Sequence, residues 1–208
     1  TLWRGDYPGS YGWNPIAGIF DYDLPGGTYF HPGLWSQFYI NNYTGNPEHA
    51  NIEPYPMHFI IDMTREALLG RSIFYPLPSP TSVHPNGPYH IAVWATNEEP
   101  KQPEDFNNDK MASLAYWTTW PEVNGTGAWM DDWDKLGEWK FDAPSGAKNM
   151  NLWTPDDILW GYSGIELEFN AEYTNKPYRY LRIVCYESFE GSQLLQFYKW
   201  EIFGSVVR

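Results

Sequence analysis

Short apolar runs, several of them alternating with polar residues, recur from residue 57 to the end of the chain and are bounded by Gly, Pro or Asn. A period of two is typical of a half-buried β-strand. In GIELEFN, residues 164–170, the apolar side chains fall on one face and Glu166 and Glu168 on the other. Runs of this kind predict strands at residues 57–63, 89–96, 137–142, 164–170, 178–187 and 194–204.

Helical signals are few. The 18 Pro and 18 Gly residues leave little room for a long helix, and EALLGR, residues 66–71, predicts a single helical turn. Three stretches, residues 1–56, 74–88 and 97–160, show little periodicity beyond the strand at 137–142 and are expected to be long irregular loops. Many short strands without helical connectors favour an antiparallel β-sandwich.

The last two runs, 178–187 and 194–204, flank a Gly-bearing loop, so we expect two strands that meet near the C-terminus. The chain of 208 residues contains no linker-like stretch and is expected to be a single domain, with residues 1–15 as a possible preceding linker. The chain has one cysteine, Cys185, so no internal disulfide can form. Cys185 lies in an apolar run, which indicates a buried thiol.

The charge of the chain limits which partners it can bind. The formal net charge is −13, and this field repels polyanions, which argues against nucleic acid, acidic membrane surfaces and sulfated glycans. The chain begins at Thr1 without a signal peptide or membrane-spanning run, so we expect a mature or trimmed chain and no direct membrane insertion. Aromatic residues make up 19% of the chain, a share that predicts exposed rings suited to sugars or partner proteins.

Several motifs then carry a resemblance. YRYLRI followed by KWEIFG resembles the closing strands of the discoidin, or coagulation factor 5/8 type C, family. FDYDLPGGTYFH (20–31) is similar to the early acidic loop of that family, HFIIDM (58–63) to its WIxIDLG strand, and YHIAVWATNE (89–98) to its YxIxVSxDG strand. The motifs occur in the family's order, and the resemblance covers residues 15–205.

A closer resemblance is to the discoidin-like domain at the C-terminus of surface lipoproteins from glycan-degrading bacteria, through WDKLGEWKF (133–141), PSG (144–146) and GIELEF. The resemblance implies an antiparallel jelly-roll β-sandwich of the galactose-binding-like type. It also implies binding through loops at one end and an exported protein, attached to the cell surface or outer membrane, periplasmic or extracellular. Fold alone does not settle function.

The resemblance further implies a structural Ca²⁺ between the early acidic loop and the last strand. Carried over to this chain, its side-chain ligands would be Asp21, Asp23, Thr28 and Glu201, all of them oxygen donors that suit Ca²⁺. This chain departs from the family in having Tyr22 between the two Asp residues and a longer run to the Thr. The alternative is a plain turn, with Glu201 paired to an Arg or a Lys.

Aromatic residues supply the candidate ligand-binding positions. Trp faces stack on the C–H surfaces of sugar rings, and neighbouring polar groups take the hydroxyls. Two regions, 116–139 and 31–43, mix the two kinds of side chain. The alternatives are a cluster of Trp rings that fills the inside of a long loop and a loop histidine bonded to backbone. The candidate residues are His31, Trp35, Tyr39, Trp117, Trp120 and Trp129.

Catalytic motifs are missing from the sequence. It contains no HExxH, GxSxG, P-loop or GxGxxG, and nothing marks a carboxylate pair for glycoside hydrolysis. We therefore expect a non-catalytic carbohydrate-binding module that holds neutral glycans and lies beside other domains of the same protein. A structural or protein-interaction module is the alternative, and a glycoside hydrolase is less favoured.

Overall fold

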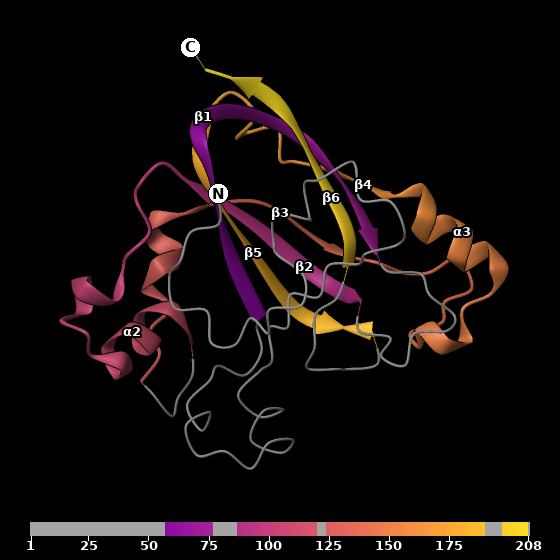
Figure 1. Ribbon diagram of the computed structural model, residues 1–208, viewed down its shortest axis with the longest axis horizontal. Coiled ribbons are helices and arrows are strands. Elements are labelled where there is room, and N and C mark those ends of the chain that lie inside the picture. The colour runs from indigo at the N-terminus through magenta and orange to yellow at the C-terminus, as the bar shows by residue number, and fades with distance from the viewer. Residues whose placement is uncertain (1–56, 77–86, 120–123, 190–196, 208) are drawn as a thin grey trace.

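The computed structural model describes residues 57–76, 87–119, 124–189 and 197–207, which form a β-rich domain with short helices at two opposite sides (Figure 1). The strands are β1 (Met57–Pro76), β2 (Pro88–Thr96), β3 (Asp134–Lys140), β4 (Ile165–Glu168), β5 (Pro177–Ser188) and β6 (Phe197–Val206). The α-helices are α2 (Lys110–Trp117) and α3 (Pro155–Ser163), and the 3-10 turns are η3 (Pro103–Phe106), η5 (Ala128–Asp132) and η6 (Met150–Leu152).

Strand β1 is the element that joins the two layers. The strand order is β3-β2-β5-β1-β4, with β6 also paired to β1, and every pairing is antiparallel. Residues 57–68 of β1 pair with β5, whereas residues 67–76 pair with β6 and residues 71–74 with β4 on the other side. One long strand thus belongs to both layers, and the predicted all-β antiparallel sandwich is confirmed.

The corner between the two halves of β1 is fixed by a local hydrogen-bond network. The register with β5 shifts between Asp62 and Ala67, and Thr64 has a φ of 65°. The carboxylate of Asp62 accepts the Thr64 backbone N–H at 2.7 Å and two bonds from the Arg179 guanidinium at 2.9 and 3.0 Å. The hydrogen bond from Arg179 holds the pKa of Asp62 below its ordinary value. A paired carboxylate therefore stabilises the backbone where the strand turns.

The core lies between the layers. Ile91, Val93 and Ile183 of the first layer pack in one cluster with Phe74 and Trp200 of the second. On β4, Leu167 is buried while Glu166 and Glu168 are exposed, so the alternation predicted there is confirmed. Cys185 is fully buried, and burial raises the pKa of its thiol, as expected for a structural cysteine.

A second apolar cluster covers the outer face of the first layer. Helix α2 and turn η5, which together we call the α2–η5 cover, lay Trp117 and Trp129 over Ile60, Tyr180 and Val184 of the sheet. Figure 1 shows α2 beside the strands on the side away from α3. The part of the first layer formed by β1 and β5 is therefore covered on both faces.

Three sequence predictions were wrong. Residues 66–71 do not form a helical turn but continue β1 to Pro76, because pairing with β6 and with β5 at Ala67 and Leu68 overrides local helix propensity. The stretch 97–160 is not irregular throughout, since it contains α2, α3 and three 3-10 turns besides β3. Strands β5 and β6 do not pair with each other in the described sheet, because each pairs with a different half of β1.

Helix α3 begins with a capping box that the sequence could have revealed. The Thr154 hydroxyl accepts the Asp157 N–H at 3.3 Å, the Asp157 carboxylate accepts the Thr154 N–H at 2.7 Å, and Pro155 is the first helical residue. Asp157 also accepts the Ser145 N–H at 2.8 Å, which ties the preceding loop to the helix. Neither this helix nor any other in the described ranges has the length and apolar character to cross a bilayer.

Candidate ligand-binding groove

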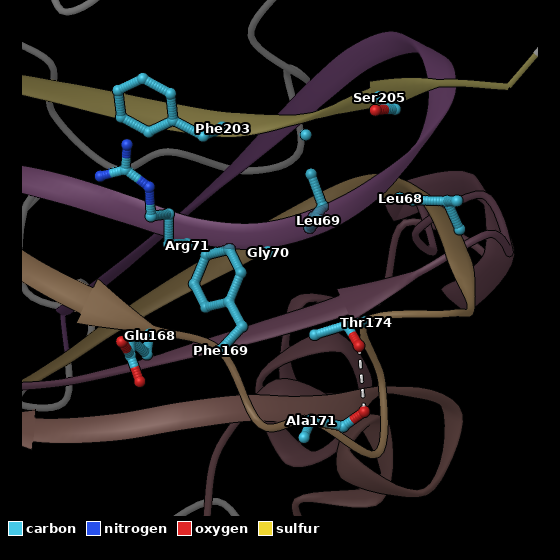
Figure 2. Close-up of a pocket in the computed structure, with 11 residues that line it drawn as sticks. Leu68, Leu69, Gly70, Arg71, Glu168, Phe169, Ala171, Thr174, Phe203 and Ser205 are labelled. Atoms are coloured by element: carbon cyan, nitrogen blue, oxygen red, sulfur yellow. Dashed lines mark hydrogen bonds between the residues drawn. The ribbon is translucent and has the colours of Figure 1, made fainter.

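An open groove of about 570 Å³ lies on the second layer, where β1 and β6 run side by side and the chain leaves β4. Figure 2 shows its lining, which comes from residues 68–71 of β1, residues 203–205 of β6 and the segment 168–174. These segments are far apart in the sequence and meet only because β1 pairs with both β4 and β6. The groove is thus a product of the sheet topology.

A β-bulge at Gly70 shapes the groove. Leu69 pairs with Gly204 and Arg71 pairs with Phe203, so Gly70 is an extra residue on β1. Its carbonyl accepts the Phe169 N–H at 3.1 Å, and a Cβ added to Gly70 would meet nothing within 4 Å. A glycine inside a strand often marks a bulge or a place where a ligand approaches the backbone. Here it leaves open space beside the backbone.

Arg71 and Phe203 form one wall. The guanidinium carbon of Arg71 lies 4.2 Å from the centre of the Phe203 ring, within the range of a cation–π contact. Arg71 Nη1 also donates to Glu166 Oε1 at 2.7 Å across to β4. Figure 2 shows the guanidinium turned toward Phe203. The two contacts place the Arg71 guanidinium between Glu166 and one face of the half-exposed phenyl ring.

Polar groups complete the lining. Glu168 is exposed and stands beside Arg71, its partner in the β1–β4 register. The Thr174 hydroxyl donates to the Ala171 carbonyl at 3.0 Å and retains its acceptor capacity, and Ser205 is exposed on β6. The groove therefore offers an aromatic ring, a carboxylate and hydroxyl groups within one open concave surface.

The predicted Trp positions fall elsewhere. Trp129 is only 5% exposed and lies against Trp94 and Trp133, while Trp117 is half-buried over Arg182. Both rings belong to the α2–η5 cover, in agreement with the alternative of a Trp cluster inside a long loop. The other predicted ligand-binding residues, His31, Trp35, Tyr39 and Trp120, lie outside the described residues.

The predicted calcium ligands are described only in part. Asp21, Asp23 and Thr28 lie outside the described residues. Glu201 is half-buried on β6, and its Oε2 accepts the Tyr75 hydroxyl at 2.9 Å. Within the described ranges, no three His, Cys, Asp or Glu side chains come together in a way that could hold a metal ion. The calcium site stays a prediction.

Sequence reasoning missed the groove, although one signal was present. The run of strand-forming residues after 57 is interrupted by Gly70, and an isolated glycine in a strand pattern suggests a bulge or a close backbone approach. Treating EALLGR as a helical turn hid that signal. Phe203 could not be assigned to the same place as Arg71, because their pairing is long-range.

Comparison with solved structures places the fold among known domains. A SusE-like protein matches with a TM-score of 0.54 and 21% identity over 74% of this chain. The chain spans about half of that protein, 48% of its length. The C-terminal domain of a chitobiase from Bacteroides fragilis matches with a TM-score of 0.48 and 14% identity, covering 93% of this chain and 83% of that one.

A fragment of a putative chitobiase from Bacteroides thetaiotaomicron matches with a TM-score of 0.41 and 18% identity, covering 75% of this chain and 65% of that one. At these identities the likeness is one of fold. No curated protein sequence matches the chain. Residues 35–204 match the family DUF5000, described as a domain of unknown function, and the chain therefore belongs to that family.

Proposed function

We propose that this domain is a non-catalytic carbohydrate-binding module and that the groove between β1 and β6 holds the glycan. The observation that carries the proposal is the half-exposed Phe203 ring, which contacts Arg71 and lies beside open polar groups. A sugar ring presents C–H groups on its faces and hydroxyls around its edge, so it needs an aromatic surface next to hydrogen-bonding groups. The groove combines both over the gap that Gly70 leaves.

The carboxyl groups support a binding role over hydrolysis. A glycosidase needs one carboxyl group whose pKa is raised, opposite a second carboxylate. The described carboxyl groups with shifted pKa values are Asp62, Glu138 and Asp157, and all three are lowered. A hydrogen bond from Arg179 lowers the pKa of Asp62, and hydrogen bonds from Lys135 and His90 lower that of Glu138. Burial raises the pKa of Asp157, but hydrogen bonds from Ser145 and Thr154 outweigh it. Each is a structural carboxylate.

The family resemblance agrees with a glycan-binding role. The motifs of surface lipoproteins from glycan-degrading bacteria occur in this chain, and a SusE-like protein shares its fold. We infer that the domain belongs to an exported, surface-attached protein and lies beside other domains of that protein. Its glycan contact would be weak at each site, because an open groove leaves little binding energy beyond the cost of ordering the ligand.

A second candidate function is a protein-interaction module. It is favoured by apolar side chains exposed around α3, namely Leu152 at 70%, Leu159 at 65% and Tyr162 at 59%. Large exposed apolar side chains that lie together mark contact surfaces. This surface is separate from the lining of the groove, so the two functions can be tested independently.

The test is a screen of the purified domain on plant, host and microbial glycans, followed by two variants. Phe203→Ala removes the ring of the groove, and Tyr162→Ala removes an exposed ring from α3 as the matched control. We expect Phe203→Ala to weaken binding at least about tenfold and Tyr162→Ala to leave it unchanged. Binding that survives Phe203→Ala places the site elsewhere, and a negative screen favours the protein-interaction module.

A further inference from the structure

The charged side chains at the groove differ in whether they form an ion pair. Arg71 donates to Glu166 at 2.7 Å and lies over Phe203, so its charge is already balanced by one carboxylate and its guanidinium plane covers one face of the ring. Both Glu166 and Glu168 project from β4 on the same side, because they are two residues apart on one strand. Two carboxylates thus stand beside one guanidinium.

Of these two carboxylates, Glu168 is the one without a partner among the described residues. It pairs with Arg71 in the backbone register, yet the guanidinium goes to Glu166 instead. Figure 2 shows the carboxylate of Glu168 turned away from Arg71, at the rim of the groove. Its oxygens are therefore available to a ligand that occupies the groove.

An ionised carboxylate only accepts hydrogen bonds, so it needs donors from the ligand. Sugar hydroxyls supply neutral donors, and a protonated amino group supplies a donor with a favourable charge. The carboxylate of a uronic acid supplies no donor at this position and brings like charges together. At longer range, the net charge of −13 likewise attracts cationic ligands and repels anionic ones.

We propose that Glu168 is the specificity-determining residue of the groove and that it favours glycans with a free amino group over neutral glycans, and neutral glycans over those with a uronic acid. This inference rests on the proposed function, because it concerns the same groove. It assigns the selection to one exposed side chain, whereas Phe203 supplies contact area that does not distinguish the three classes.

The test uses glucose and two of its charged derivatives, glucosamine with an amino group at C2 and glucuronic acid with a carboxylate at C6, together with the corresponding galacto series for the other common configuration. Binding is followed by NMR through the backbone amide signals of Gly70 and Gly204, which report on the groove itself. The pH is held at about 6, where amines are protonated and carboxylates ionised. We expect the amino sugar to bind roughly threefold to tenfold more tightly than the neutral sugar.

Three variants isolate the role of Glu168. Glu168→Gln should equalise the amino and neutral sugars, and Glu168→Lys should reverse the order in favour of the uronic acid. Glu104→Gln, which changes the same charge on η3 outside the groove, should leave the order intact. The preference for the amino sugar should also fall steeply in about 1 M salt, while binding of the neutral sugar persists.

The outcomes separate the two proposals. If neither series shifts the two glycine signals, the groove does not bind sugars, and both proposals fail. If the sugars bind but the acid binds as well as the amine, or Glu168→Gln changes nothing, the specificity proposal is overturned and the binding function stands.

Discussion

Gly204 on β6 passes so close to Leu68 on β1 that a Cβ on Gly204 would stand 2.2 Å from the Leu68 carbonyl oxygen. Real Cβ atoms do not approach backbone that closely, so only glycine fits unless one strand moves. The two residues lie beside the bulge at Gly70, where the register of the two strands shifts. The glycine that ends the KWEIFG motif is thereby explained by packing against β1.

The two glycines of the groove should differ in how strongly a substitution by Ala destabilises the protein. Gly204→Ala forces β6 away from Leu68, and we expect it to lower the free energy of unfolding by about 1–3 kcal/mol. Gly70→Ala meets open space and should change that free energy by less than about 0.5 kcal/mol. Urea unfolding of both variants measures the difference, and equal losses would contradict the close approach.

Filling the groove from Gly70 should block binding without unfolding the protein. Gly70→Leu places a side chain in the open space, where its Cβ clashes with nothing. We expect a melting temperature close to that of the wild type and a loss of glycan binding of about tenfold or more. Thermal melts and the glycan screen report the two effects separately. Full binding by a stable Gly70→Leu protein would exclude this groove as the site.

Asp157 should make stability depend on acid pH. It is fully buried, which alone would raise its pKa, but hydrogen bonds from Ser145 and Thr154 outweigh burial and lower the pKa to about 2. Because the folded pKa lies below the unfolded value of 3.8, its contribution is present above that value. The contribution is lost as the pH falls through the window between 3.8 and about 2.

Asp157→Asn tests that contribution, since the amide cannot replace all the charged hydrogen bonds. We expect a loss of about 2 kcal/mol at neutral pH and a flatter melting-temperature profile in acid. Asp156→Asn, its exposed neighbour on the same helix, is the control and should follow the wild-type profile. Parallel profiles for wild type and Asp157→Asn would show that Asp157 does not cause the acid dependence.

Arg182 should hold the α2–η5 cover on the sheet. It is 1% exposed, and its guanidinium carbon lies 4.4 Å from the Trp117 ring and 4.1 Å from the Trp129 ring. Arg182→Ala leaves a void between the two rings, and we expect a loss of about 3 kcal/mol with a red shift of Trp fluorescence. Arg65→Ala, an exposed control on β1, should change neither quantity measurably.

The predicted calcium site can be tested with a substitution of Glu201. The resemblance predicts that Ca²⁺ raises the melting temperature of chelator-treated protein, because an ion that binds only the folded state stabilises it. Glu201→Gln keeps an oxygen to accept the Tyr75 hydroxyl but loses the charge, so it should abolish the increase. If Ca²⁺ has no effect on the wild type, the predicted site is rejected. An increase that persists in Glu201→Gln excludes Glu201 as a ligand.

Local patterns were enough to locate most strands. The alternation in GIELEF, bounded by Gly164 and Asn170, predicted a strand with Leu167 buried and Glu168 exposed, and the structure has both. Similarly, the run at 89–96 lies within β2 and that at 178–187 within β5. These strands could be predicted because the alternation of apolar and polar residues within a half-buried strand identifies its buried and exposed faces.

Other elements were not readable from local sequence. EALLGR favours a helix by composition, yet it is strand because its residues pair with β6 on one edge, and with β5 and then β4 on the other. The Trp residues around 117–133 were compatible with an open platform or a buried cluster. In the structure Trp129 is buried and Trp117 half-buried, and both rings contact Arg182, which is remote in the sequence. Composition cannot distinguish these cases, because burial depends on the partner surface.

The sequence by itself therefore determined the β class, the faces of several strands and the acidic field that shapes the choice of partners. The position and lining of the groove depend on the tertiary structure alone. Its parts are Gly70, Arg71, Glu168 and Phe203, which come from three strands and meet because β1 bends at Asp62 and pairs on both sides beyond the corner. Side-chain periodicity is a property of one strand, whereas a binding surface depends on which strands become neighbours.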